Sequence, residues 1–306
     1  MTRQSAAGGL LVIGDVVTDV VALHANALAP GTDTAARIAF RPGGSGANTA
    51  AWAARSGADV RLLARVGANS ADWHRDELLD AGVRPHLVVD EKAATAVVIS
   101  LVDAEAERTF VTDSGAAVRL GVEDWDAALL DSVARIHLSG YLYFTRPGRQ
   151  LAATVHAAGR AWGLPVSVDP ASTGFIEKLG LPAFLAEVGG AGLILPNLAE
   201  ARLLAGTADP VAAAERLSAA HGEAVVKLGA AGALAAERGR LIAEVPGVAA
   251  SAVDSTGAGD AFTGGFLAAR LAGADLAEAT AAGCRSGAAA VEVVGGRPPL
   301  DRDAGR

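Results

Sequence analysis

Short apolar segments alternate with longer helix-like segments along most of this 306-residue sequence. The apolar segments are bounded by Gly, Pro or Asp, which is typical of strands buried on both faces of a parallel sheet. The helix-like segments end at or near Gly, a common stop signal for crossover helices. We therefore predict an α/β fold, a doubly wound, mostly parallel sheet with helices on both faces. The predicted strands are residues 11–13, 60–66, 135–138, 166–168, 193–195 and 224–228, and the predicted helices are residues 48–56, 73–80, 148–162, 198–205 and 211–221.

Two stretches depart from this alternation, at about residues 16–41 and 94–114. Polar and apolar residues there alternate at a period of two, as in Ala36–Arg41 and Thr95–Asp103. This pattern is typical of half-exposed strands, and we expect antiparallel strands outside the main sheet. They could form a small lid over a ligand site at the carboxyl edge of the main sheet, or a hairpin at the edge of the domain. Because no repeat or linker is evident, we expect residues 1–306 to form one domain that includes this lid.

The charge and cysteine content exclude several classes of protein. The 26 Lys and Arg residues against 34 Asp and Glu give a net charge of −8, and there is no long basic run, so we expect no nucleic-acid partner. The single cysteine, Cys284, excludes an intrachain disulfide and a zinc–thiolate cluster. No window of about 18 residues is both apolar and uncharged, so we expect no membrane span. The apolar run at residues 10–13 is too short for a signal peptide, and we expect a cytoplasmic protein.

A glycine-rich turn near the C-terminus carries the strongest chemical signal. Gly257, Ala258 and Gly259 precede an apolar run, so their backbone N–H groups can converge on an anion at a helix N-terminus. Asp260 follows directly, and a carboxylate beside an anion site could handle a proton or could simply cap the helix. The next glycine, Gly264, is misplaced for the dinucleotide fingerprint, which disfavours an oxidoreductase.

Two further segments carry polar groups at the expected edge of the sheet. Gly43 and Gly44 allow the backbone to approach a ligand closely, and Asn48 could either bind a hydroxyl or cap a helix. Asn197 and Glu200 follow a predicted strand; they could form a capping pair, or they could hold Mg²⁺ through water.

These motifs resemble those of one family. The segments from Gly43 to Asn48 and from Asp254 to Asp260 are similar to the two signatures of the ribokinase-like (phosphofructokinase B) carbohydrate kinases. Asn197-Leu-Ala-Glu200 resembles the Asn-x-x-Glu element of that family, and residues 14–19 and 226–232 also fall in the family's order. The resemblance covers about residues 10–300 and implies a ribokinase-like fold and an ATP-dependent kinase that uses Mg²⁺.

The resemblance implies a role for each matching residue. Asp260 would be the general base that takes a proton from a substrate hydroxyl, beside an anion hole formed by residues 257–259. Asn197 and Glu200 would organise Mg²⁺. The substrate hydroxyls would be held by Asp19, Gly43, Gly44 and Asn48, and the nucleotide would lie along Lys227, Leu228, Gly229 and Gly232.

Two implied features are less direct. We expect the side chain of Lys227 to be solvated, with adenine meeting backbone and apolar groups instead. Some members of the family bind K⁺, and Asp254 and Thr256 match that element together with the loop at residues 290–296, although Pro298-Pro299 departs from the usual sequence.

The substrate is the least determined feature. Ribokinases carry Asn at the position of Val17, which makes ribose less favoured, while Ser45 and Thr49 resemble the fructokinase and nucleoside-kinase variants. We predict phosphorylation of a hydroxymethyl group on a small sugar; the alternatives are a nucleoside kinase, or a sugar or nucleotide sensor without activity. Three arginines of the lid stretches could bind a phosphorylated sugar or could be solvated: Arg37, Arg41 and Arg108.

The lid stretches also offer a contact between two copies of the chain. Ile38, Phe40, Val97 and Ile99 are apolar residues in these half-exposed strands, and they could form the interface of a homodimer.

Overall fold

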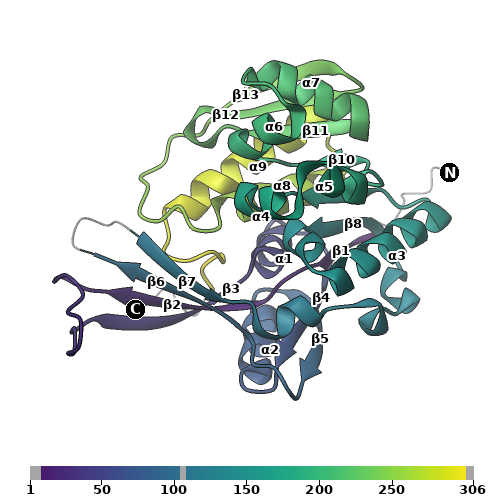
Figure 1. The fold of residues 1–306 in the computed structure, drawn as a ribbon. Coiled ribbons are helices and arrows are strands. Elements are labelled where there is room, and N and C mark those ends of the chain that lie inside the picture. Colours follow the sequence, from purple (N-terminus) through teal and green to yellow (C-terminus); the bar gives the residue numbers. More distant parts are fainter. Residues whose placement is uncertain (1–7, 104–107, 301–306) are drawn as a thin grey trace.

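The main sheet has nine strands in the described part of the chain, which a computed structural model gives as residues 8–103 and 108–300 (Figure 1). The strand order is β13-β12-β11-β10-β9-β8-β1-β4-β5, and every neighbouring pair is parallel from β11 to β5. Only β12 and β13 run antiparallel to their neighbours, at one edge. This confirms the predicted α/β class. The strands are β1 (Gly9–Ile13), β4 (Val60–Gly67), β5 (Val83–Asp90), β8 (Val133–Ser139), β9 (Val166–Asp169), β10 (Leu193–Ile194), β11 (Glu223–Lys227), β12 (Gly232–Glu237) and β13 (Arg240–Pro246).

Helices pack on both faces of this sheet. Strand β1 shows why, because its alternate residues enter two separate apolar cores: Leu11 and Ile13 pack in one and Leu10 and Val12 in the other. The first core includes residues of α3 to α7, and the second includes residues of α1, α2, α8 and α9. The helices are α1 (Ser45–Arg55), α2 (Ala71–Asp80), α3 (Arg146–Trp162), α4 (Thr173–Leu179), α5 (Leu181–Val188), α6 (Leu198–Ala205), α7 (Pro210–His221), α8 (Ala258–Leu271) and α9 (Leu276–Val291). No helix in the described ranges is long and apolar enough to cross a bilayer.

Helix α1 begins three residues before the predicted start. Its N-cap is Gly44, whose φ of 97° favours glycine, and the carboxylate of Asp15 accepts hydrogen bonds from the N–H groups of Ser45 (2.9 Å) and Gly46 (3.2 Å). Asn48 therefore lies inside the helix, and the interpretation of Asn48 as its cap is wrong. The cap comes from a distant strand end, which local pattern does not show.

The two stretches that depart from the main alternation form a separate lid sheet, which Figure 1 shows projecting from the body of the molecule. Its strands are β2 (Val17–Leu23), β3 (Arg37–Gly43), β6 (Ala96–Val102) and β7 (Arg108–Asp113), in the order β3-β2-β6-β7. Each hairpin is antiparallel, but β2 and β6 pair in parallel. The expectation of purely antiparallel strands is wrong at this central pair, because both strands leave the main sheet in the same direction.

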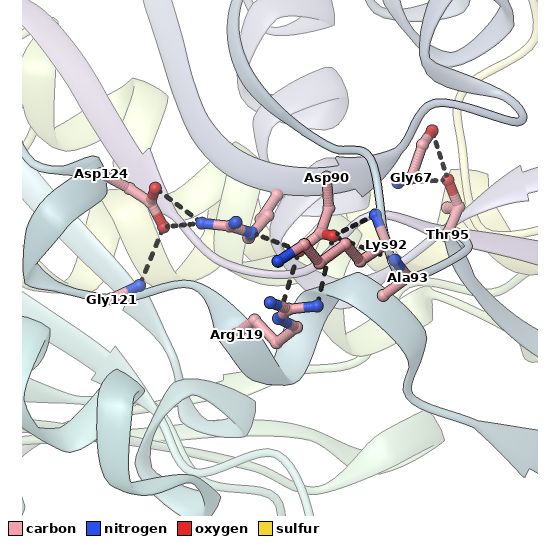
Figure 2. A network of polar contacts seen from close by, with 9 residues as sticks. Gly67, Asp90, Lys92, Ala93, Thr95, Arg119, Gly121 and Asp124 are labelled. Carbon is pink, nitrogen blue, oxygen red and sulfur yellow. Dashed lines mark hydrogen bonds and ion pairs between the residues drawn. The ribbon is translucent and has the colours of Figure 1, made fainter.

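A buried carboxylate fixes the lid to the main sheet. Asp90 ends β5, and its two oxygens accept hydrogen bonds from the N–H groups of Lys92 and Ala93 and from Arg65 (2.9 Å each) (Figure 2). Arg119 contacts the same carboxylate at 3.2 Å. The hydrogen bond from Lys92 lowers the pKa of Asp90 to about 2, helped by the other donors. The chain segments that enter β6 and leave β7 are thus held at one point.

Arg65 joins this point to the segment after the lid, since it also contacts Asp124 at 2.8 Å. We expect Arg65→Met to lower the melting temperature by about 5 °C, because two carboxylates then lose their shared cation. Arg84→Met is the matched control: it removes an exposed pair with Asp59 and should change the melting temperature by less than about 1 °C. Equal effects in a thermal melt would show that Arg65 is not an anchor.

Candidate active site

A cavity of about 1220 Å³ lies at the carboxyl ends of the parallel strands, between the main sheet and the lid. This is where open α/β sheets bind ligands. Most of the residues singled out in the sequence line it: Asp19, Gly44, Asn48, Asn197, Glu200, Lys227, Gly229, Gly232, Thr256, Gly257, Ala258, Gly259 and Asp260. Gly43, Leu228 and Asp254 lie beside these residues in the chain but are not part of the lining.

Asp260 is held from across the cavity by helix α1. Its Oδ1 accepts a hydrogen bond from Ser45 Oγ (2.8 Å), and its Oδ2 accepts one from Asn48 Nδ2 (2.9 Å). The N-cap of its own helix, α8, is Gly257, so the interpretation of Asp260 as a helix cap is wrong. Two neutral donors orient the carboxylate and leave it facing the cavity.

The pKa of Asp260 lies near neutral pH. Burial raises the pKa of this carboxyl to about 7, the hydrogen bond from Asn48 offsets part of that rise, and the nearby carboxylate of Asp169 adds to it. A carboxyl with a pKa near 7 can both accept and release a proton at neutral pH.

The turn before Asp260 requires glycine. Gly257 has a φ of 72°, and a Cβ at this position would lie 2.5 Å from the Cα of Gly296. The turn opens the 14-residue helix α8, and the first amides of a helix have no acceptor inside it. The N–H groups at this end are thus available to an anion in the cavity.

Asp19 lies against the first glycine-rich turn. A Cβ on Gly43 would overlap its carboxylate, so glycine lets this carboxylate lie directly against the turn. Burial, with the neighbouring Asp15, raises the pKa of Asp19 to about 6. Arg297 acts in the opposite direction on that pKa, and its Nη2 donates a hydrogen bond to the carbonyl of Gly43 (3.2 Å). Arg297 gave no signal in the sequence, because it follows the last predicted element.

Lys227 is not solvated, which corrects our expectation. Its Nζ lies 2.5 Å from Asp169 Oδ2, and only 12% of its side chain is exposed. The same Oδ2 accepts a hydrogen bond from Thr263 Oγ1 (2.9 Å). Lys227 Nζ also lies 3.6 Å from the position that a Cβ on Gly259 would take. The ammonium therefore stands beside the glycine turn, at the end of β11, and Asp169 at the end of β9 is a site residue that the sequence analysis missed.

Asn197 and Glu200 cap the start of α6 reciprocally. Glu200 accepts hydrogen bonds from the backbone N–H (2.9 Å) and the Nδ2 (2.6 Å) of Asn197, whose Oδ1 accepts one from the N–H of Glu200 (2.9 Å). The capping interpretation is confirmed, yet both side chains also face the cavity. Burial raises the pKa of Glu200 to about 7, and the charge of Asp169 contributes.

The surplus of carboxylates in the cavity suits a bound cation. Asp169, Glu200 and Asp260 face the same space, and two of them have raised pKa values. Among the described residues, no cluster of three or more His, Cys, Asp or Glu is compact enough to hold a metal ion alone. A cation would therefore need further oxygens from water or from a ligand, as Mg²⁺ commonly has.

The two halves of the implied K⁺ element do come together. Asp254 Oδ1 accepts hydrogen bonds from the N–H (2.9 Å) and Oγ1 (2.7 Å) of Thr256, while its Oδ2 accepts one from the N–H of Gly295 (3.0 Å). The carboxylate thus links residues 254–256 to the loop at residues 290–296.

The part of the lining next to the turn after β11 is small and apolar. Leu228 leads into a turn at Gly229–Ala231, closed by the hydrogen bond from the N–H of Leu228 to the carbonyl of Gly232 (2.8 Å). Helix α9 contributes Cys284, Gly287, Ala288 and Val291 to the same region. Such a wall suits a flat heterocycle that meets backbone and apolar groups.

The fold and the cavity together define a ribokinase-like protein, with a strand lid over the carboxyl edge of a parallel sheet. An adenosine kinase of Sinorhizobium meliloti has the same fold, with a TM-score of 0.85 at 22% identity and 96% coverage of each chain. A ribokinase-type protein of Escherichia coli, in complex with ATP and Mg²⁺, has a TM-score of 0.82 at 23% identity and 94% coverage of each chain.

Comparisons of the sequence with known proteins show which family the chain belongs to. Residues 8–303 match the pfkB family carbohydrate kinases. The chain is 30% identical over 271 residues to a fructokinase of Klebsiella pneumoniae, covering 85% of this chain and 84% of that protein. It is 28% identical over 275 residues to a ribokinase of Haemophilus influenzae, covering 86% and 85%. The chain belongs to the pfkB family of carbohydrate kinases, and the predicted class of enzyme is confirmed.

Proposed function

We propose that this protein transfers the γ-phosphate of ATP to a hydroxymethyl group of a small sugar, with Asp260 as the general base. The observation that carries this proposal is the position of one carboxylate: Asp260 faces the cavity at the N-terminus of α8, oriented by Ser45 and Asn48. Its pKa of about 7 suits a group that must accept a proton at neutral pH.

In the proposed reaction, the substrate hydroxyl gives its proton to the carboxylate of Asp260. The hydroxyl oxygen forms a bond to the γ-phosphorus, and the bond between that phosphorus and the β,γ-bridging oxygen breaks, so that ADP leaves. Asp19 and Asn48 would hold the other hydroxyls of the sugar, at the turn formed by Gly43 and Gly44. This arrangement puts the reacting oxygen between the base and the phosphoryl group.

The main task of such a site is to stabilise negative charge on the transferring group. We infer that residues 257–259 provide the anion hole, since their amides open a helix that faces the cavity. Lys227 would add a positive charge beside Gly259. The nucleotide would extend from there along Leu228, Gly229 and Gly232 toward the small apolar wall.

The carboxylates in and beside the cavity favour the binding of two cations, Mg²⁺ and K⁺. Glu200 and Asn197, with Asp169, would hold Mg²⁺ through water, and Mg²⁺ supplies charge neutralisation for the ATP phosphates. Asp254 and Thr256 would serve a K⁺ ion next to the anion hole, because the carboxylate of Asp254 holds residues 254–256 against the loop at residues 290–296. Cys284 is the only cysteine of the sequence and can form no intrachain disulfide, which fits the cytoplasmic location that we propose.

The test is an ATP-consumption panel across hexoses, pentoses, keto sugars and nucleosides, run with Mg²⁺ and with or without K⁺. We expect turnover with at least one acceptor, and faster turnover with K⁺ than with Na⁺. If ATP binds and no acceptor is phosphorylated, the proposed function is wrong. If K⁺ and Na⁺ give equal rates, the K⁺ site is wrong.

The proposed nucleotide-binding part of the cavity, beside helix α9, can be tested without turnover. Cys284 lines the cavity there and is the only cysteine of the sequence. We expect ATP to slow the alkylation of Cys284 about tenfold when ATP is present at ten times its Kd. The measurement is mass spectrometry of the intact protein after a timed exposure to iodoacetamide. A sugar acceptor added alone is the control and should not protect. An unchanged rate with ATP would mean that the nucleotide binds elsewhere.

We also propose that the outer face of the lid joins two copies of the chain. Phe40, Val20, Ile99 and Val111 form one row across the four strands, on the side opposite to Asp19. Phe40 is 66% exposed and Val111 55%, which is costly for an apolar face in water.

Phe40→Asp is expected to convert a dimer to a monomer in sedimentation experiments, because it places a charge in that apolar row. Phe110→Asp is the matched control: Phe110 is 58% exposed but lies on the other face of the same lid sheet. Dissociation by both variants, or by neither, would contradict this interface.

A further inference from the structure

We propose that the acceptor is an uncharged sugar that carries a flat ring, a nucleoside, and that sugar phosphates and sugar acids are poor substrates. The inference rests on the proposed function and narrows it: a nucleoside still offers the hydroxymethyl group of its sugar, but the acceptor is a sugar that carries a base rather than a free small sugar. Two independent features of the wall carry it: the distribution of charge and a group of three aromatic rings.

The cavity wall is strongly acidic. Among the described lining residues, six side chains are carboxylates and one is a cation, Lys227. A phosphorylated acceptor would bring a dianion into this space, and an uncompensated charge in a partly desolvated site is costly. The carboxylates are Asp15, Asp19, Asp113, Asp169, Glu200 and Asp260.

The one cation is at the wrong end for an acceptor phosphate. Lys227 is paired with Asp169 at 2.5 Å and lies beside Gly259, where the phosphoryl group of ATP would be received. The lid end of the cavity carries Asp19 and Asp113 instead. Among the described lining residues, an acceptor phosphate at this end would therefore meet carboxylates and no cation that could pair with it.

Two arginines lie close to this end, but neither lines the cavity. Arg41 pairs with Asp19 across the β2–β3 ladder, at the edge of the lid, and its side chain is exposed. Arg297 is only 8% exposed and donates to the carbonyl of Gly43. Both arginines are rivals to this proposal, since Arg41 is exposed and the Nε and Nη1 of Arg297 are buried without a hydrogen-bond partner; a comparison with ribose 1-phosphate as acceptor tests both.

Three aromatic rings form a continuous apolar surface on the wall. Phe144 and Phe175 are stacked with ring centroids 5.0 Å apart, and Tyr141 packs edge-on against both, at 6.2 and 5.8 Å. Tyr141 and Phe175 keep 38% and 40% of their surface exposed, although the chain is only 4% aromatic. Exposed rings that line a cavity favour a ligand with a face to stack on them.

The three rings share one cavity with the residues proposed to bind the acceptor. Tyr141 and the proposed base, Asp260, line the same cavity. On the lid side, Val17 and Val98 give the same space an apolar wall. A sugar bound at Asp260 and Asp19 would place a ring substituent against this apolar surface, whereas a free sugar would leave the rings in water.

The first test compares matched acceptors with the full chain, ATP and Mg²⁺: adenosine, inosine and cytidine against ribose and ribose 1-phosphate. We expect kcat/KM for the best nucleoside to exceed those of ribose and ribose 1-phosphate by about 100-fold or more. A sugar phosphate as the best acceptor, or ribose equal to the nucleosides, would overturn the proposal.

Direct binding separates this inference from the proposed function. If no acceptor is phosphorylated but calorimetry shows that a nucleoside binds and ribose 1-phosphate does not, the phosphoryl transfer is wrong and the inference about the wall holds. If ribose 1-phosphate binds more tightly, or if no nucleoside binds, the inference is overturned.

Variants of the wall give the second test. Phe175→Ala should raise KM for the nucleoside about tenfold and leave KM for ATP unchanged, because one stacking surface is lost. Trp162→Ala is the matched control, since Trp162 is 56% exposed at the end of α3 and outside the cavity. Arg41→Ala should leave KM for the acceptor unchanged. A large rise in KM for the acceptor in Arg41→Ala would overturn the proposal. An equal rise in Phe175→Ala and Trp162→Ala would also overturn it.

Discussion

Asp260→Asn is expected to lower kcat by about 10³ while ATP binding is retained. Asparagine preserves the size of the side chain and an acceptor for Ser45 or Asn48, but it cannot take a proton from the substrate. The rate is measured by ADP release with the best acceptor, and ATP binding by the protection of Cys284. Asp131→Asn, at an exposed turn, is the control and should keep full turnover. Unchanged turnover in Asp260→Asn would show that the base is assigned wrongly.

The pH dependence of kcat/KM is a second test of the role of Asp260. Only the deprotonated form can act as base, so kcat/KM of the wild-type protein should rise about tenfold per pH unit below pH 7 and level off above it. The pKa of Asp260 is raised from its ordinary value of 3.8 to about 7, so its contribution to stability is present below about pH 4 and lost as the pH rises through 7. Asp260→Asn should therefore raise the melting temperature at pH 8 and not at pH 4.

Lys227→Met is expected to reduce kcat by about 10² to 10³, because the developing charge on the phosphoryl group loses the cation beside Gly259. The variant should also be less stable by about 3–5 kcal/mol, since Asp169 is left buried without its partner. Kinetics are measured well below the melting temperature of the variant, so that only folded protein is compared.

A matched variant separates catalysis from stability. Arg270 contacts Glu223 at 2.8 Å, at the start of the same strand β11 and away from the cavity, and the two side chains are 16% and 21% exposed. Arg270→Met should lower the melting temperature but leave kcat within about twofold. If Arg270→Met lowers kcat as much as Lys227→Met does, the role of Lys227 is structural.

Much of the fold could be predicted because its signals are local. The buried strands and the crossover helices follow from apolar periodicity and glycine stops, and helix α6 has the predicted bounds, Leu198–Ala205. The lid was predicted from its period-two pattern. Its parallel β2–β6 pair was not, because strand pairing depends on where the chain crosses the molecule rather than on the pattern inside either strand.

The candidate site also has features that could be predicted from the sequence and features that could not. The glycine turns could be recognised from the sequence, and glycine is required at positions 44 and 257, where φ is positive and a Cβ would lie 2.6 and 2.5 Å from backbone atoms. The partners of the charged groups could not. Asp260 is oriented by Ser45, which is 215 residues away, and Lys227 is withdrawn from solvent by Asp169 on another strand.

The sequence by itself determined the α/β class, the glycine turns and the motifs that identify the family, because each depends on residues close together in the chain. Only the tertiary structure decided which carboxylates share one cavity, where the single cation of its described wall lies, and which aromatic rings line that cavity. Those features depend on strand ends that meet at one edge of a sheet, and their energies come from burial and charge across that edge.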